Sequence, residues 1–89
     1  MVYLISYDLR RPGQDYKTLH DAIKAYGNWA KPLESLWLID TAQSAQQIYD
    51  RLRPHMDDND SLLITSIGRD RQGWLSQEIW NWLNGRMAA

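Results

Sequence analysis

The feature that most constrains the fold of this chain is an apolar run at its start, residues 2–9, with the sequence VYLISYDL. The run is rich in β-branched and aromatic residues and is closed by turn-forming residues at 10–13, so it predicts a strand rather than a helix. Alternate residues of a strand point to opposite faces, and both sets are mostly apolar here. This pattern is typical of a central strand that is covered on two sides.

Asp8 is the exception in this run, because it places a carboxylate at the carboxyl end of the expected strand. A charged group at that place must be solvated, paired or bound to a metal ion. Two interpretations follow from the residue alone. Asp8 either hydrogen-bonds the amides of the following turn, or it serves as a metal ligand or catalytic base at the rim of the sheet.

Composition sets further limits on the class of protein. With 89 residues, the chain is expected to form one small domain that gains extra burial by oligomerisation. The lack of cysteine excludes disulfides, thiolate metal sites and cysteine nucleophiles. The opening run is short and interrupted by Ser6 and Asp8, so we expect neither a signal peptide nor a membrane span, and a cytoplasmic location.

Charge and aromatic content bear on the partners of the chain. A net charge of −1 argues against a nucleic-acid footprint over the whole surface, although it leaves room for local basic patches. The five Trp and five Tyr residues, with no Phe, suit half-wet surfaces where one end of the ring is buried. This composition is typical of an interface, and a small core that needs large side chains would show the same pattern. We expect a homodimer with Trp74 or Trp80 at or near the contact.

The remaining pattern alternates helices and strands. We expect a helix capped by Asp15 and ended by Gly27, a strand over 34–41, a helix that starts at a Ser44–Gln47 capping box and ends near Arg53, a strand over 61–67, and a Trp-rich helix over 74–84. Residues 29–33 are interrupted by Pro32, which suits an edge or a bulge. If they pair with the next strand, the two form one bent strand or a hairpin. The acidic stretch 57–60 is interpreted as a solvated turn, because its spacing does not match a calcium loop.

This order of elements favours a ferredoxin-like α+β domain, a split β-α-β with antiparallel strands. Residues 1–68 would form its core, and 69–89 a C-terminal loop and helix. The alternative, a small parallel α/β sheet, normally needs a Gly-rich phosphate turn after the first strand, and residues 10–14 do not supply one.

The candidate chemistry centres on Asp8 and basic residues. The sequence has no nucleophile elbow or phosphate-binding loop, and His20 and His55 lack zinc-site spacing. The candidate nucleic-acid-binding residues are the arginines after the first and last strands, together with one lysine: Arg10, Arg11, Lys31, Arg69 and Arg71. The alternative is that these are solvated loop residues, and whether the two loops converge is left open. A carboxylate beside phosphate-binding arginines suits Mg²⁺-assisted attack on a phosphodiester, and two copies across a two-fold axis would supply two carboxylates.

Three short motifs carry a family resemblance. They are LISYD at 4–8, AYG at 25–27 and SLW at 35–37, with Tyr7, Ser35 and Trp37 as the most characteristic residues. In their order and spacing, over residues 2–68, the chain resembles the CRISPR-associated protein two superfamily, which includes the virulence-associated protein D ribonucleases. It is most similar to a branch labelled SinR-like. The chain differs from this family in having no arginines at the start of its first helix, and a Trp-rich segment in place of the final strand.

The resemblance implies a ferredoxin-like homodimer in which Asp8 and its symmetry mate face one another and share a divalent ion such as Mg²⁺. It also implies that the chain acts on, or holds, RNA or DNA. We therefore weigh three functions: a metal-dependent endoribonuclease or DNase with Asp8 as its catalytic residue, a non-catalytic nucleic-acid scaffold, and a protein-interaction dimer. An integrase would be the expected partner of a scaffold, and an antitoxin that of a ribonuclease.

Overall fold

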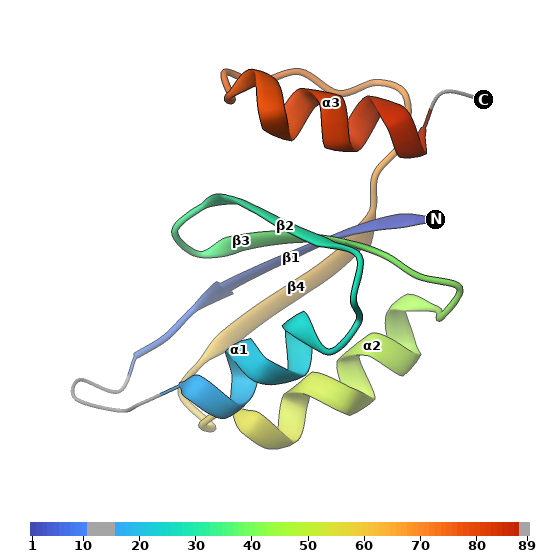
Figure 1. The fold of residues 1–89 in the computed structure, drawn as a ribbon. Coiled ribbons are helices and arrows are strands. Elements are labelled where there is room, and N and C mark those ends of the chain that lie inside the picture. The colour runs from blue at the N-terminus through green and yellow to red at the C-terminus, as the bar shows by residue number, and fades with distance from the viewer. Residues whose placement is uncertain (11–15, 88–89) are drawn as a thin grey trace.

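The strands of this protein form one antiparallel sheet in the order β2-β3-β1-β4 in a computed structural model that describes residues 1–10 and 16–87 (Figure 1). Within these residues the domain is α+β, with four strands and three α-helices. The elements are β1 (Val2–Asp8), α1 (Lys17–Lys24), β2 (Trp29–Leu33), β3 (Leu36–Asp40), α2 (Ala45–Leu52), a 3-10 turn (Arg53–His55), β4 (Ser61–Ser66) and α3 (Gln77–Arg86).

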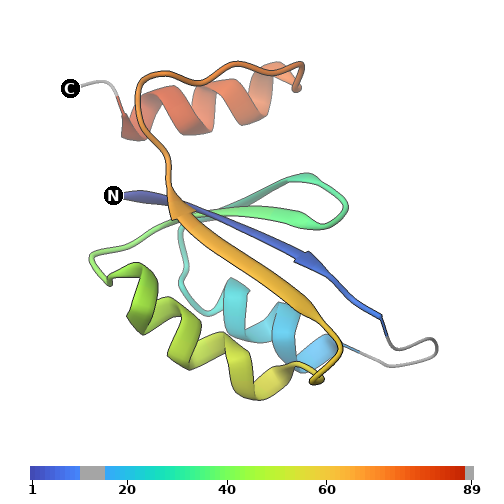
Figure 2. The ribbon, with the colours of Figure 1, turned by 180° about the vertical axis from the view of Figure 1, so that it is seen from behind.

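β1 is central, as its two apolar faces predict. It pairs with β3 on one side and with β4 on the other, both antiparallel, and Asp8 lies opposite Ser61 at the start of β4. The first and last strands are thus neighbours, and the antiparallel sheet excludes the parallel alternative. Figure 2 shows β4 running alongside β1 from behind the sheet.

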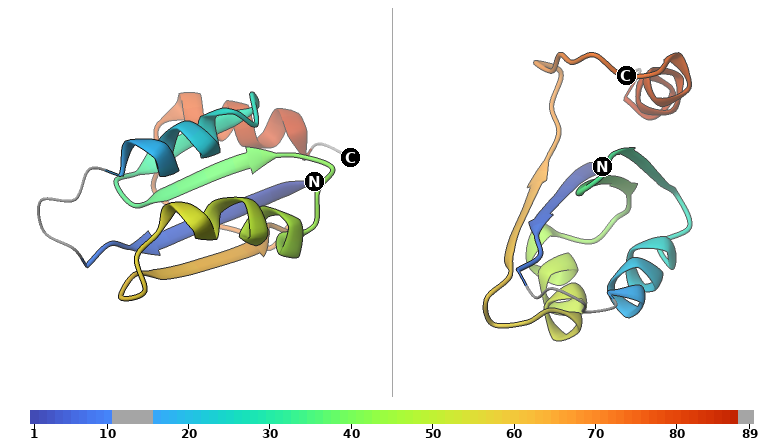
Figure 3. Two further views of the ribbon diagram at one scale, coloured as in Figure 1. Left: turned by 90° about the horizontal axis from the view of Figure 1, so that it is seen from below. Right: turned by 90° about the vertical axis from the view of Figure 1, so that its left-hand side faces the viewer.

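Two layers of helix enclose the sheet (Figure 3). α1 and α2 cover one face, where Ile5 and Trp37 pack with the helix residues Leu19, Ile23 and Ile48. α3 lies over the other face, where a smaller buried cluster joins residues from three strands and α3: Val2, Ala30, Leu38 and Leu83. The two clusters account for the apolar residues on both faces of β1.

β2 and β3 form a hairpin, which decides between the two expectations for residues 29–33. β2 is an edge strand, and its register with β3 shifts between Ala30 and Leu33. Pro32 lies within this irregularity, and edges and bulges are the places in a sheet where proline, which lacks an N–H, is tolerated. Its predicted place, an edge or a bulge, is confirmed.

Local signals fixed most helix ends. The Ser44–Gln47 capping box is present, and α2 ends at Leu52, just before the turn that contains Pro54. Gly27 has a φ of +84°, which suits its place after α1. α1 begins at Lys17 with Tyr16 at the N-cap, while the expected cap, Asp15, lies outside the described residues.

The C-terminal helix differs from the expectation for 74–84. α3 spans Gln77–Arg86, because the Ser76 side chain accepts a hydrogen bond from the Ile79 N–H and caps the helix there. Trp74 therefore precedes the helix, and Gly85 lies inside it rather than after it. Trp80, one of the two tryptophans expected at or near a dimer contact, is partly buried and packs against the second core cluster. No helix in the described part of the chain is long and apolar enough to cross a membrane.

Candidate functional site

The Asp8 side chain lies at the carboxyl end of β1 and is open to solvent. Its carboxylate is 61% exposed, and its Oδ2 atom is 2.7 Å from Arg10 Nη2. Arg10 Nε donates to the same oxygen at 2.9 Å. Asp8 is therefore a paired surface carboxylate, held by the residue two positions further along the chain.

Asp60 anchors the backbone that carries Arg10. Its Oδ1 atom accepts hydrogen bonds from the Arg10 N–H at 2.8 Å and from the Tyr16 hydroxyl at 3.0 Å, and its Oδ2 atom accepts from the Asp57 N–H at 2.8 Å. The stretch 57–60 is thus more than the solvated turn that its composition predicts. Asp60 therefore links three segments of the chain: the end of β1 through Arg10, the start of α1 through Tyr16, and its own turn through Asp57.

The electrostatics of Asp60 follow from these contacts. Partial burial by itself raises the pKa of a carboxyl group, but the hydrogen bonds from Arg10, Asp57 and Tyr16 and the charge of Arg53 outweigh it. The pKa of Asp60 therefore lies below the usual range, and the side chain is ionised at neutral pH. A charged, multiply bonded Asp60 fixes where the chain leaves β1.

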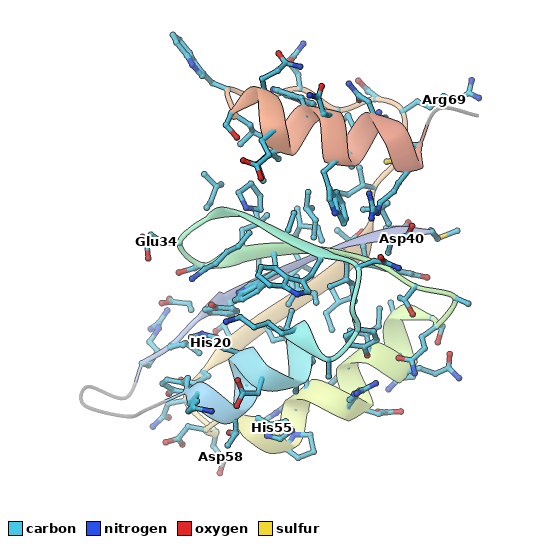
Figure 4. The ribbon with its side chains drawn as sticks, viewed as in Figure 1. His20, Glu34, Asp40, His55, Asp58 and Arg69 are labelled. Carbon is cyan, nitrogen blue, oxygen red and sulfur yellow. The ribbon has the colours of Figure 1, made fainter. Side chains whose placement is uncertain are left out.

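The basic residues expected to bind nucleic acid do not converge. β4 runs antiparallel to β1, so its carboxyl end lies beside the amino end of β1. Arg69 and Arg71 therefore follow β4 at the end of the sheet opposite to Asp8 and Arg10. In Figure 4, Arg69 lies beside α3, on the other side of the sheet from His20 and Asp58. Arg71 is committed to structure, since it donates to Gly68 O at 3.1 Å and to Asn84 Oδ1 at 3.0 Å. Arg11 lies outside the described residues.

The three residues that characterise the family motifs do lie together. The Trp37 Nε1–H donates to the Tyr7 hydroxyl at 3.0 Å, and the Tyr7 N–H donates to Ser35 O at 3.2 Å. His20 joins them, with its Nε2 atom 3.2 Å from the Tyr7 hydroxyl and its ring centroid 5.8 Å from that of Trp37. His20 is therefore a packing residue of this cluster. Because Trp37 is 1% exposed, the cluster belongs to the core beneath the rim and not to an open site.

Lysines and tryptophans extend this cluster to the edge of the sheet. Lys31, the fifth expected basic residue, lies with its Nζ atom 5.1 Å from the centroid of the Trp37 ring. Trp29 and Lys24, which were not among the candidates, lie next to it: the Trp29 and Trp37 rings are 5.2 Å apart, and Lys24 Nζ is 5.6 Å from the Trp29 ring. The alternation of Trp29 and Lys31 on one strand face was the available signal. It was hidden because residues 29–33 could not be assigned as a strand with Pro32 among them.

Two carboxylates lie at this end of the sheet, and that of Asp60 already accepts hydrogen bonds from Arg10, Tyr16 and Asp57, which leaves Asp8 as the candidate metal ligand. No group of three or more His, Asp or Glu side chains in the described residues could hold a metal ion. The carboxylate oxygens of Asp8 are of the hard type that Mg²⁺ prefers, and Mg²⁺ often takes only one or two carboxylates and keeps its waters. The donor chemistry of Asp8 therefore fits Mg²⁺, and a second copy of the chain would supply a second Asp8 carboxylate.

Comparisons of the chain with models of protein families, with curated proteins and with solved structures find no match.

Proposed function

We propose that the domain is ferredoxin-like and related to the CRISPR-associated protein two superfamily. Support for the fold is the element order β-α-β-β-α-β together with the sheet order β2-β3-β1-β4, in which β3 is inserted between β1 and β2. Support for the relationship is the contact between Tyr7, Ser35 and Trp37, which places the motif residues at the end of β1 that bears Asp8.

We further propose that the protein is a metal-dependent nuclease that acts as a homodimer in the cytoplasm. The observation that carries this proposal is the exposed carboxylate of Asp8 at the carboxyl end of the central strand, with a guanidinium beside it. A carboxylate at the rim of a sheet is free to meet its symmetry mate, whereas a carboxylate in the core is not. The substrate would be a phosphodiester of RNA or DNA.

Asp8 and Arg10 have separate roles in this mechanism. Asp8 of each copy would hold Mg²⁺, which supplies a water of lowered pKa and offsets the charge of the phosphate when bound. Arg10 orients Asp8 and still has N–H donors to spare, because its contacts to Asp8 use two of the five. Those remaining donors can grip the scissile phosphate. Asp60 keeps Arg10 in place through the Arg10 backbone N–H.

The decisive experiment is a cleavage assay on labelled RNA and double-stranded DNA, with Mg²⁺ or with EDTA. Asp8→Asn should lower the rate by at least about a hundredfold, because the amide holds Mg²⁺ poorly. Asp70→Asn is the matched control, since Asp70 is an exposed carboxylate in the loop after β4, at the opposite edge of the sheet. Absence of cleavage by the wild type, or equal cleavage by Asp8→Asn, rejects the nuclease.

A second candidate is a non-catalytic nucleic-acid scaffold. It is favoured by two observations: Asp8 is already neutralised by Arg10, and no group of three or more His, Asp or Glu side chains in the described residues could hold a metal ion. Binding that weakens with salt but leaves the substrate intact would support the scaffold, with an integrase as its expected partner. If neither RNA nor DNA binds at low salt, the remaining function is a protein-interaction dimer.

A further inference from the structure

The edge of the sheet beside α1 carries a surface of alternating aromatic and basic side chains. We call it the tryptophan–lysine edge and define it as Lys24 of α1 with Trp29 and Lys31 of β2. Trp29 is 36% exposed, and both lysines are exposed. β2 is the outermost strand on this side, and α1 lies along it (Figure 3).

The interior of the protein holds this edge in place. The Trp29 ring lies against Trp37, with centroids 5.2 Å apart and planes inclined by 55°. Trp37 is itself fixed by its hydrogen bond to the Tyr7 hydroxyl at 3.0 Å. Trp29 is therefore a pre-positioned aromatic ring, so a ligand that stacks on it does not have to order it first.

Both lysines can turn to an incoming anion. The Lys24 ammonium lies 5.6 Å from the Trp29 ring centroid and the Lys31 ammonium 5.1 Å from that of Trp37, at exposed sites where such contacts are weak. Neither lysine forms a salt bridge within the described chain, and the nearby Asp21 is paired with Lys17 at 2.7 Å. The β2–β3 turn carries the acidic residue Glu34, whose side chain points to solvent (Figure 4).

An added β-strand is a poor occupant of this edge. Pro32 removes a backbone donor from β2, and the register shift between Ala30 and Leu33 interrupts the ladder that a new strand would extend. A lysine in an edge strand, here Lys31, also discourages such pairing. Recognition here must therefore use the side chains and not the backbone.

We propose that the tryptophan–lysine edge binds single-stranded nucleic acid. A base stacks on Trp29 and displaces the flexible Lys24 side chain, and the ammonium groups of Lys24 and Lys31 then contact the flanking phosphates. Aromatic faces bind unstacked bases of any sequence, while in a duplex the base faces are already covered. The positive charges of the two lysines complement the negative phosphates of the backbone. This local basic patch is compatible with a net charge of −1 for the whole chain.

This site is separate from Asp8, although one line of contacts joins them. Trp29 touches Trp37, Trp37 bonds to Tyr7, and Tyr7 precedes Asp8 in β1. A single-stranded nucleic acid bound along the edge would thus run toward the rim where Asp8 and Arg10 lie. Binding at the edge needs no metal ion and no cleavage, so it stands or falls independently of the proposed nuclease.

The test is fluorescence anisotropy with labelled oligothymidylate and oligouridylate of about 15 nucleotides, and with a duplex of the same length, all in EDTA. The single strands should bind more tightly than the duplex. Trp29→Ala should weaken single-strand binding by about 5- to 100-fold, and Trp29→Phe should retain most of it. Lys24→Gln and Lys31→Gln should each reduce the slope of log K against log salt by about 0.7.

Two controls separate stacking from folding and from nonspecific contact. Trp29→Leu keeps an apolar cover over Trp37 without an aromatic face, so it should bind weakly while the near-ultraviolet circular dichroism of the core is retained. Tyr49→Ala removes an exposed aromatic ring of α2, outside the edge, and should leave binding unchanged.

Any of three results overturns the proposal: no single-strand binding at low salt, equal binding of the duplex, or unaltered binding by the folded Trp29→Leu variant. Asp8→Asn should bind like the wild type. If Asp8→Asn loses cleavage but binds normally, the result bears only on the role of Asp8 as a catalytic residue. If the wild type cleaves but the Trp29 variants bind normally, the result overturns only the proposed binding at the tryptophan–lysine edge.

Discussion

At the scale of single residues, Asp60 has the largest predicted effect on the end of the sheet that bears Asp8. Asp60→Asn should lower the free energy of unfolding by about 1–2 kcal/mol. The amide can keep one acceptor for Arg10 and Tyr16, but its NH₂ group then faces the Asp57 N–H, donor against donor. Urea denaturation followed by tryptophan fluorescence measures the loss. Asp58→Asn is the control, since Asp58 is fully exposed and its ion pair with Arg53 is worth little.

The same contacts make the contribution of Asp60 dependent on pH. Its folded-state pKa is lowered, so its stabilisation is present above the unfolded value of about 3.9 and is lost as pH falls through the folded pKa. The stability gap between wild type and Asp60→Asn should therefore be constant from about pH 5 to 7 and shrink below about pH 4. A gap that persists unchanged at low pH would contradict this account.

Sequence reasoning located Asp8 and Arg10 but not the role of Asp60, and the reason is the distance along the chain. Asp8 and Arg10 are two residues apart, so their pairing is a local event. Asp60 meets Arg10 and Tyr16 only because β4 returns beside β1, with Ser61 opposite Asp8. A composition such as DDND cannot show which of its carboxylates will meet such partners.

At the scale of elements, the end of α1 depends on Gly27. Its φ of +84° strains any residue with a side chain, although no atom lies within 4 Å of an added Cβ. Gly27→Ala should thus destabilise the protein by about 1 kcal/mol through the backbone alone. Gly68→Ala is the matched control: its surroundings are equally open and its φ lies outside the strained range, so stability should be unchanged or rise slightly. Equal losses in the two variants would refute the assignment. Both are measured by thermal and urea unfolding.

Element boundaries were predictable where the signal was local. The Ser44 capping box and the stop before Pro54 depend on neighbours within one or two turns, and both are confirmed. The start of α3 was wrong because the apolar residue Trp74 suggested an earlier helix, whereas the Ser76 cap sets the boundary. The hairpin of β2 and β3 could not be chosen from sequence, since it depends on which strands lie side by side in the sheet.

At the scale of the whole molecule, the second face of the sheet is incompletely covered. α3 packs toward β2, while on β4 the Leu63 side chain is 60% exposed. Leu33 is 53% exposed and Trp74 is 100% exposed. An open groove of about 570 Å³ lies between α3 and the sheet, lined by Leu4, Leu36 and Trp80 among others. Exposed apolar residues gathered on one face of a small domain favour association.

The last prediction is therefore a two-fold dimer through this face. Sedimentation equilibrium at micromolar protein should give twice the chain mass of 10.5 kDa, that is 2 × 10.5 = 21.0 kDa. Leu63→Ser and Trp74→Ser should each weaken the dimer by about tenfold or more, because large apolar side chains at the centre of an interface carry most of its affinity. Tyr49→Ser is the matched control, since Tyr49 is an exposed aromatic residue of α2, on the other side of the sheet. A monomeric wild type would refute the dimer. A dimer weakened by Tyr49→Ser but not by Leu63→Ser or Trp74→Ser would place the contact on the opposite face, where Asp8 of the two copies would have to meet across α1 and α2.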